Sequence, residues 1–323
     1  MAAPRELDDL DRLLALDPGG RGVTRYATPG AALAAAHGLR RARRVVIVTG
    51  FCVPPGIPET DGPPGTAVLG RALRRLGARV RYVTDASVRG SLAASLSALG
   101  EPADVDVYHP GAEAARALLG RETPSHLIAI ERPGRTSTGE YLSARGESVA
   151  PWNSPLDEIF LLAAKKGRTE PRRSASRPPT ARAGHATPAT TVAVGDGGNE
   201  IGMGNVRPRL AREGTLMARI ASAVRVDYLV VAGVSNWGAY GIVAALSRLS
   251  GQMLLHSAAE ERRLIEACVE AGAVDGITRR PEPTVDGLPL EAHAGFVALL
   301  GRSVLEPGDR RAQIRREVDR VRW

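Results

Sequence analysis

The chain has 323 residues, 43% of them hydrophobic, a composition typical of a folded globular protein that excludes a largely disordered chain. Its longest apolar runs, such as residues 228–234, are too short to cross a bilayer, so we expect no membrane contact. The net charge is +8, but seven Lys or Arg residues and a single Glu lie within residues 165–182, so most of the excess belongs to one segment. That segment lacks aromatic residues that could stack on bases, and we expect no nucleic-acid partner.

The N-terminal residues mix acidic side chains with leucines. They lack the basic and apolar regions of a signal peptide, and they are not acid-poor as transit peptides are. We therefore expect residues 1–28 to form an N-terminal capping helix in a cytoplasmic protein. Residues 29–323 are predicted to form one α/β domain.

Short apolar runs alternate with helical patterns along this domain. Buried parallel strands are predicted at residues 44–51, 80–85, 104–109, 126–131, 191–195 and 227–234. Helices are predicted at residues 31–43, 66–76, 91–99, 112–119, 236–249, 258–271 and 291–300. The order predicts an open, doubly wound, mostly parallel sheet with helices on both faces, a Rossmann-like fold of three layers. Residues 167–190, rich in Pro, Arg, Ser and Thr, are expected to form a mobile basic loop.

The sequence GDGGNEIGMGN at residues 195–205 directly follows a predicted strand. Ligands of such sheets bind outside the carboxyl ends of the strands, so this segment is a candidate site. Asp196, Asn199 and Glu200 offer oxygen ligands as catalytic candidates, and Gly197 and Gly198 let the backbone approach a substrate closely.

The same segment does not fit a nucleotide-binding motif. Glu200 stands where the dinucleotide fingerprint needs glycine, and Met203 stands where a P-loop needs lysine. We therefore expect no nucleotide cofactor.

A second candidate segment is ETDGPPG at residues 59–65, between the first strand and a helix predicted from about residue 66. The N–H groups at such a helix start can bind a carboxylate or phosphate, which makes Thr60, Gly62 and Gly65 candidate substrate contacts. Asp61 could hold an ammonium group, a metal ion or a proton. Alternatively, Asp61 only caps the turn.

Three further polar residues lie near the ends of predicted elements. Glu131 ends the strand at 126–131, and Asp286 lies in the polar sequence VDGLP. Asn236 follows the strand at 227–234, where it could cap the next helix or donate a hydrogen bond to a substrate carboxylate.

Taken together, these segments resemble the D-glutamate cyclase family, specifically the C-terminal domain of the long eukaryotic mitochondrial enzymes and its stand-alone prokaryotic relatives. The matching segments occur in the family's order over roughly residues 30–300. They are ETDGPPG (59–65), YLSARG (141–146), PLDEIF (155–160), VGDGGNEIGMGNV (194–206), AGVSNWGAY (232–240) and VDGLPLEAH (285–293). The resemblance implies conversion of D-glutamate to 5-oxo-D-proline with loss of water, a lyase reaction.

The resemblance also implies that Asp61, Asp196, Asn199, Glu200, Asn236 and Asp286 are motif positions. For the reaction, we predict a divalent ion held by Asp196 and Glu200, with Glu131, that neutralises the reacting carboxylate. An oxygen-rich ligand set favours Mg²⁺, Mn²⁺ or Ca²⁺ over Zn²⁺. Asp61 is the predicted acceptor of the ammonium proton.

Two sets of alternatives stay open at this point. The acids could bind the substrate ammonium directly, with Arg145 neutralising a carboxylate. The chain could also be a metal-dependent, phosphatase-like hydrolase of a small anionic metabolite, or a non-catalytic amino-acid-binding protein. A homodimer is expected only because dimers are the commonest oligomers.

Overall fold

The computed structural model describes residues 8–168 and 188–304. Its centre is a six-stranded sheet in the order β5-β4-β1-β6-β7-β8, and every neighbouring pair is parallel. The strands are β1 (Arg44–Thr49), β4 (Arg79–Thr84), β5 (Val105–Val107), β6 (His126–Ile130), β7 (Thr190–Gly195) and β8 (Tyr228–Val231). All six predicted strands are present, and the predicted open, doubly wound sheet is confirmed.

The predicted first strand was too long at its carboxyl end. β1 stops at Thr49 because Gly50 has a φ of 96°, a conformation that glycine adopts easily and that breaks the strand. The chain then forms a small antiparallel hairpin of β2 (Cys52–Val53) and β3 (Ile57–Pro58). This turn places the segment at 59–65 beside the end of the sheet.

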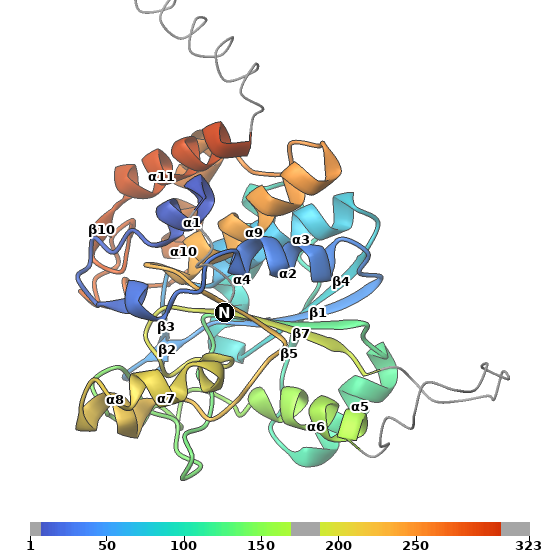
Figure 1. The fold of residues 1–323 in the computed structure, drawn as a ribbon, viewed down its shortest axis with the longest axis vertical. Helices are drawn as coiled ribbons and strands as arrows, with labels where there is room; N and C mark the ends of the chain where they lie inside the picture. Colours follow the sequence, from blue (N-terminus) through green and yellow to red (C-terminus); the bar gives the residue numbers. More distant parts are fainter. Residues whose placement is uncertain (1–7, 169–187, 305–323) are drawn as a thin grey trace, which may run out of the picture.

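Helices cover both faces of the sheet, giving the three layers that the sequence predicts (Figure 1). The upper layer holds α1 (Asp9–Leu14), α2 (Ala31–Leu39), α3 (Pro63–Arg75), α4 (Ala86–Ala98), α9 (Ser235–Ser250), α10 (Ala258–Glu270) and α11 (Leu290–Val304). The lower layer holds α5 (Ala112–Glu122), α6 (Asp157–Arg168), α7 (Arg207–Leu210) and α8 (Thr215–Ile220). The prediction missed α6, α7 and α8. Two of these have only four and six residues, too short for a helical period to show.

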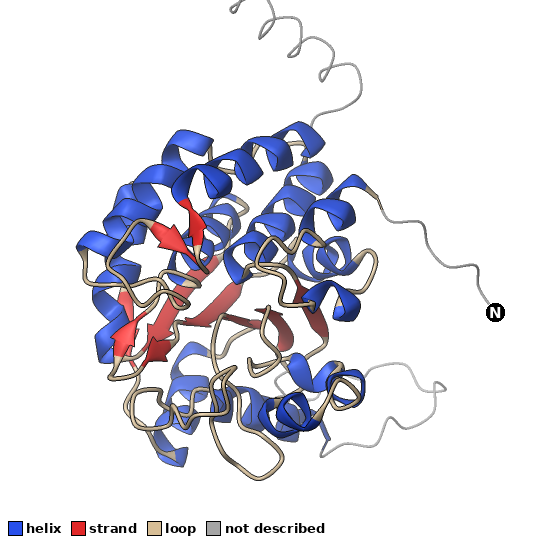
Figure 2. Cartoon of the chain, turned by 90° about the vertical axis from the view of Figure 1, so that its left-hand side faces the viewer, coloured by secondary structure: helices blue, strands red, loops and turns tan. Residues whose placement is uncertain are grey.

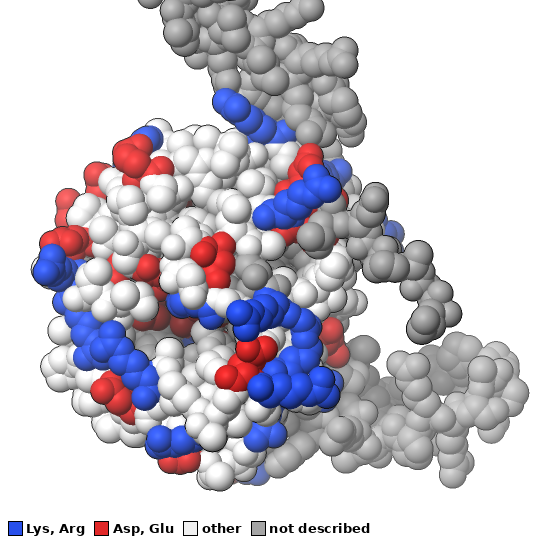
Figure 3. Space-filling view, turned by 60° about the vertical axis from the view of Figure 1, so that its left-hand side comes forward, with Lys and Arg blue, Asp and Glu red and all other residues white. Residues whose placement is uncertain are grey.

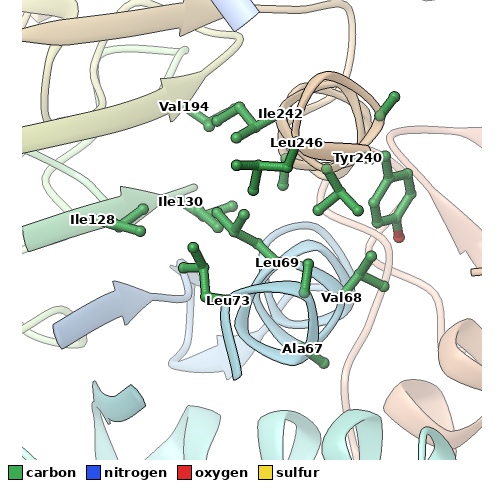
Figure 4. Close-up of a cluster of buried hydrophobic side chains, with 14 of the residues drawn as sticks. Ala67, Val68, Leu69, Leu73, Ile128, Ile130, Val194, Tyr240, Ile242 and Leu246 are labelled. Carbon is green, nitrogen blue, oxygen red and sulfur yellow. The ribbon is translucent and has the colours of Figure 1, made fainter. Parts of the chain in front are cut away.

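The largest core lies between the sheet and the upper layer, where α3 and α9 pack side by side (Figure 4). Leu69 and Leu73 of α3 and Ile242 and Leu246 of α9 are fully buried against strand residues such as Ile130. Each such side chain contributes about 1.5–3 kcal/mol by leaving water. The start of both helices is therefore held rigidly above the carboxyl ends of the strands.

The N-terminal segment lies across this end of the fold. α1 contacts α11 and α9, and the Gly233 N–H donates to the Leu14 carbonyl at 3.3 Å. Gly233 has no room for a side chain, since a Cβ there would lie 1.9 Å from the Leu16 carbonyl oxygen. We call residues 15–30 the N-terminal strap. Its ends are fixed by α1 and α2, and it includes the short 3-10 helix η1 (Val23–Tyr26).

Within the predicted capping helix at residues 1–28, the α-helix spans only Asp9–Leu14, because the glycine-rich turn at residues 17–22 interrupts it. Residues 1–7 of that prediction and residues 169–187 of the predicted basic loop lie outside the described residues. None of the helices in residues 8–168 and 188–304 combines the length and apolar character needed to cross a bilayer.

Candidate active site

The strand order places a topological switch point between β1 and β6. From β1 the chain winds outward through β4 to β5, then returns to β6 and winds the other way through β7 to β8. The loops that leave β1 and β6 therefore diverge and open a crevice. Figure 2 looks at this end of the molecule, where loops gather between the two helical layers.

Six carboxylates meet at this crevice, and we call them the acidic cluster. They are Glu59, Asp61, Glu131, Asp196, Glu200 and Asp286. All are buried except Asp286, whose side chain is 9% exposed. Figure 3 shows acidic side chains recessed in a hollow on this side of the molecule, with basic side chains beside them. Segments that are more than two hundred residues apart in the sequence thus form one site.

Two triads of oxygen atoms within the acidic cluster share Asp196. One consists of Asp61, Asp196 and Asp286, and the other of Glu131, Asp196 and Glu200. In each triad the three carboxylate oxygens lie within 4.8 Å of one another. Oxygen-only donor sets at such separations suit hard cations such as Mg²⁺, Mn²⁺ and Ca²⁺. The predicted metal ligands belong to the second triad.

Burial and mutual repulsion raise the pKa values of the acidic cluster. Burial is the largest cause for Glu59, Asp61 and Glu131, whose pKa values lie well above the ordinary range, and neighbouring carboxylates add to it. For Asp286, burial and then Asp196 raise the pKa to about 7, although Arg21 opposes the shift. Several carboxylates this close cannot all be ionised unless a cation joins them. The cluster is therefore built to attract positive charge.

One cation of the chain already reaches the cluster, and sequence reasoning missed it. The Arg21 guanidinium on the N-terminal strap donates from Nη2 to Asp196 at 2.9 Å, to Asp286 at 2.7 Å and to the Gly233 carbonyl at 2.7 Å. Its Nη1 donates to the other Asp196 oxygen at 3.3 Å. The only sequence signal was the glycine-rich turn around it, DPGGRG at residues 17–22, which allows the backbone to turn sharply at that point.

Asp61 binds the start of α9 rather than capping its own turn alone. Its Oδ2 accepts from the Ser235 N–H at 2.9 Å, and its Oδ1 accepts from the Asn236 N–H at 2.8 Å and the Gly62 N–H at 3.0 Å. The positive end of the α9 dipole favours a carboxylate at this place. Asp61 therefore fixes the α9 start within the acidic cluster.

Asn236 holds the 59–65 segment from the opposite side. Its Oδ1 accepts from the Gly62 N–H at 3.0 Å and the Gly65 N–H at 2.7 Å, and its Nδ2 donates to the Thr60 carbonyl at 3.2 Å. The two residues between these glycines are prolines, which have no N–H. The N–H groups expected to bind a ligand carboxylate at the start of α3 are therefore engaged within the protein. The Thr60 hydroxyl likewise donates to the Thr284 carbonyl at 2.8 Å.

Glu200 organises the glycine-rich segment after β7. Its carboxylate accepts from the N–H groups of Asp196 at 3.2 Å, Gly197 at 2.6 Å and Gly198 at 2.8 Å. This ring of bonds fixes the direction of the Asp196 side chain. Asn199 points elsewhere, and its Nδ2 donates to the Leu142 carbonyl at 2.7 Å, which ties the 141–146 segment to the site.

Backbone strain is concentrated at two members of the cluster. Among the described residues, four non-glycine residues have a positive φ, and Glu131 at 40° and Asp286 at 54° are two of them. Such conformations cost about 1–3 kcal/mol each and persist where the surroundings impose them, often at functional sites. Glu131 is held in addition by the Ser235 hydroxyl, which donates to it at 2.6 Å.

Arg145, another predicted site residue, lies on a loop where its backbone N–H donates to the Ser143 hydroxyl at 3.2 Å. Its side chain is exposed on the loop at 141–150, and within the described residues it has no ion pair with any of the six carboxylates. A cavity of about 510 Å³ lies at the amino ends of β1, β6 and β7, lined by Arg44, His126 and Thr190 among others. None of the predicted site residues lines it.

The chain is similar to known proteins over most of its length. The family described as "D-glutamate cyclase-like, C-terminal" matches residues 10–171 and 180–301. The chain is 31% identical over 349 residues to the protein named "D-glutamate cyclase, mitochondrial" from Homo sapiens, with 93% of this chain and 52% of that protein covered. The chain thus spans about half the length of this relative. A crystal structure of an exopolyphosphatase-related protein from Bacteroides fragilis covers 87% of this chain and 58% of its own, with a TM-score of 0.38 and 10% identity, too low to bear on this chain.

Proposed function

Because the chain belongs to the D-glutamate cyclase-like family, we propose that it converts D-glutamate to 5-oxo-D-proline and water. In this reaction the amino nitrogen forms a bond to the γ-carboxyl carbon. The nitrogen loses protons, and one γ-carboxyl oxygen leaves as water. The substrate therefore brings one ammonium group and two carboxylates into the site.

The observation that carries this proposal is the excess of buried carboxylates over cations at the switch point. Among the described residues, Arg21 is the only Arg or Lys that pairs with the six carboxylates, and it pairs with two of them, Asp196 and Asp286. A buried site of this charge favours a cationic group such as the ammonium of an amino acid, a metal ion, or both. An anionic ligand without any cation would be repelled.

The donor set also fits a divalent cation. Glu131, Asp196 and Glu200 would hold it, each through a carboxylate oxygen. When bound, such an ion would act as a Lewis acid that neutralises the γ-carboxylate. Glu200 retains lone pairs for this role, because a carboxylate offers about four acceptor positions and three are used by backbone N–H groups.

Proton removal from the ammonium is assigned to Asp286. Its pKa of about 7 suits a group that must accept a proton near neutral pH. One of its oxygens accepts from the Arg21 guanidinium, and a carboxylate has further acceptor positions beyond that bond. Asp61 was predicted for this role and stays a second candidate, although three backbone N–H groups, two of them at the start of α9, already donate to its oxygens.

The test is NMR of EDTA-treated protein incubated with D- or L-glutamate, first without metal and then with Mg²⁺, Mn²⁺ or Ca²⁺. We expect 5-oxoproline from the D-isomer only, and only after a divalent ion is added. Activity in EDTA would exclude the metal from the proposal. Folded protein that forms no product under any condition would refute the cyclase function.

A second candidate function is supported by the two oxygen triads that share Asp196. Divalent ions held by the residues of these triads would serve a metal-dependent hydrolase of a small anionic metabolite. Release of phosphate from a model ester in Mn²⁺ would favour it. Binding of D-glutamate without turnover of any substrate would favour an amino-acid-binding protein.

A cytoplasmic location and a homodimer stay predictions. The human relative is named as mitochondrial, so the family does not decide the location.

A further inference from the structure

Arg21 is held at the acidic cluster by three separate elements. Asp196 follows β7, Gly233 follows β8, and Asp286 lies in the turn between β9 (Thr284–Val285) and β10 (Leu288–Pro289). Charge-assisted bonds to two carboxylates fix a guanidinium far better than one surface ion pair does. Arg21 therefore occupies a defined position at the rim of the crevice.

The N-terminal strap is shaped to deliver this side chain. The Asp17 carboxylate accepts from the Arg21 N–H at 3.0 Å and from the Gly22 N–H at 2.6 Å, which closes the turn that carries Arg21. The strap can lie directly on the sheet end because Gly233 has no side chain. The Arg21 side chain stays 24% exposed, so part of it remains open to solvent at the crevice.

Arg21 also retains donors that the protein does not use. A guanidinium has five N–H groups in a fixed fork. Nη1 and Nη2 contact protein acceptors, whereas Nε has no partner among residues 8–168 and 188–304. Within the same residues, Arg21 is the only Arg or Lys that forms an ion pair with the acidic cluster. A dicarboxylate entering this site would meet no other cationic side chain paired with these acids.

We propose that Arg21 is a substrate-binding residue that contacts a carboxylate of the amino-acid substrate through its unused donors. This inference rests on the proposed function and deepens it, because it gives the N-terminal strap a part in recognising the substrate. It also assigns to Arg21 the neutralising role predicted from sequence for Arg145.

The experiment measures ligand affinity by calorimetry for wild type, R21Q and R25Q. Arg25 is a matched control on the same strap, with its side chain 66% exposed and paired only with Glu213 among the described residues. The ligands are D-glutamate, D-norvaline, which lacks the side-chain carboxylate, and 4-aminobutanoate, which lacks the α-carboxylate. R21Q should bind D-glutamate about 10- to 100-fold more weakly, the usual effect of removing a hydrogen bond between charged groups.

The pattern across ligands separates a direct contact from a structural role. We expect R21Q to have a lower affinity for D-glutamate and for one of the two analogues. Its affinity for the other analogue, which lacks the carboxylate bound by Arg21, should equal that of wild type. R25Q should match wild type with all three ligands. An equal loss with all three, or no loss with D-glutamate, would overturn the proposal.

If R21Q does not fold, R21K replaces it. Lysine keeps the charge but not the fork, so it should show a smaller loss with the same ligand pattern. If wild type cyclises D-glutamate and both R21Q and R21K bind it normally, the role of Arg21 is refuted but the proposed function is not. Wild type that neither binds nor cyclises D-glutamate would refute the proposed function together with it.

Discussion

Replacing Asp286 by asparagine should stabilise the protein at alkaline pH while abolishing turnover. Asparagine has the same shape, keeps a carbonyl oxygen for Arg21 and tolerates the φ of 54° at this position better than most residues do. The substitution therefore removes the ionisable group without changing the backbone. It tests whether Asp286 titrates near neutral pH.

The size of the effect depends on the shift of the pKa from 3.8 to about 7. Between these values the folded protein binds more protons than the unfolded chain, so the free energy of unfolding falls as the pH rises. Each pH unit contributes about 1.4 kcal/mol, which gives a total loss of about 4 kcal/mol by pH 8. The loss is absent below about pH 4, where Asp286 is protonated in both states.

Urea unfolding of wild type and D286N in EDTA, from pH 4 to pH 8, measures this difference. We expect equal stabilities at the acidic end and an advantage for D286N that grows to about 4 kcal/mol and then stays constant. A saturating divalent ion should reduce the advantage, because the ion stabilises ionised carboxylates. Parallel pH curves for the two proteins would refute the reasoning, since Asp286 would then be ionised throughout.

Three further substitutions test other parts of the site. D196N should lose both turnover and divalent-ion affinity, measured by NMR and calorimetry; normal turnover would remove Asp196 from the mechanism. E200Q should lower the free energy of unfolding by about 1.5–3 kcal/mol, because one charge-assisted hydrogen bond from a backbone N–H is lost. Unchanged urea unfolding would show that the hydrogen bonds to Glu200 are not needed for stability. G233A places a Cβ 1.9 Å from the Leu16 carbonyl and should displace the N-terminal strap, so its affinity for D-glutamate should fall as in R21Q. G295A, where a Cβ meets no atom within 4 Å, is its control.

The central strands β1, β6 and β7 were predictable because nearly all of their residues are buried and most are apolar. The residues of β6, for example, are buried on both faces, so their hydrophobicity is continuous and its limits are clear. The motifs after β7 and β8 could be located for the same reason, since the end of a strand fixes the position of the loop that leaves it. The end of β1 was misjudged because Phe51 and Cys52 continue the apolar run beyond Gly50 and are buried in the hairpin instead.

The candidate site was predictable only where its residues stand in glycine-rich motifs at strand ends. Arg21 could not be found in this way, because its partner Asp196 lies 175 residues away and nothing periodic links them. The engagement of Asn236 with Gly62 and Gly65 also depends on the packing of α3 against α9. Sequence patterns indicate which polar residues lie at a strand end. They do not indicate which of these residues form hydrogen bonds with one another.

The span of the acidic cluster has a consequence for folding. The ion pair between Arg21 and Asp286 joins residues that are 265 positions apart, with the whole sheet between them. A fragment that lacks either the N-terminal strap or the turn between β9 and β10 therefore lacks part of the site, and we expect it to bind a ligand more weakly than the whole domain does. A ligand that binds across this site would therefore stabilise the domain as one cooperative unit, and part of its binding energy would be lost when either end detaches.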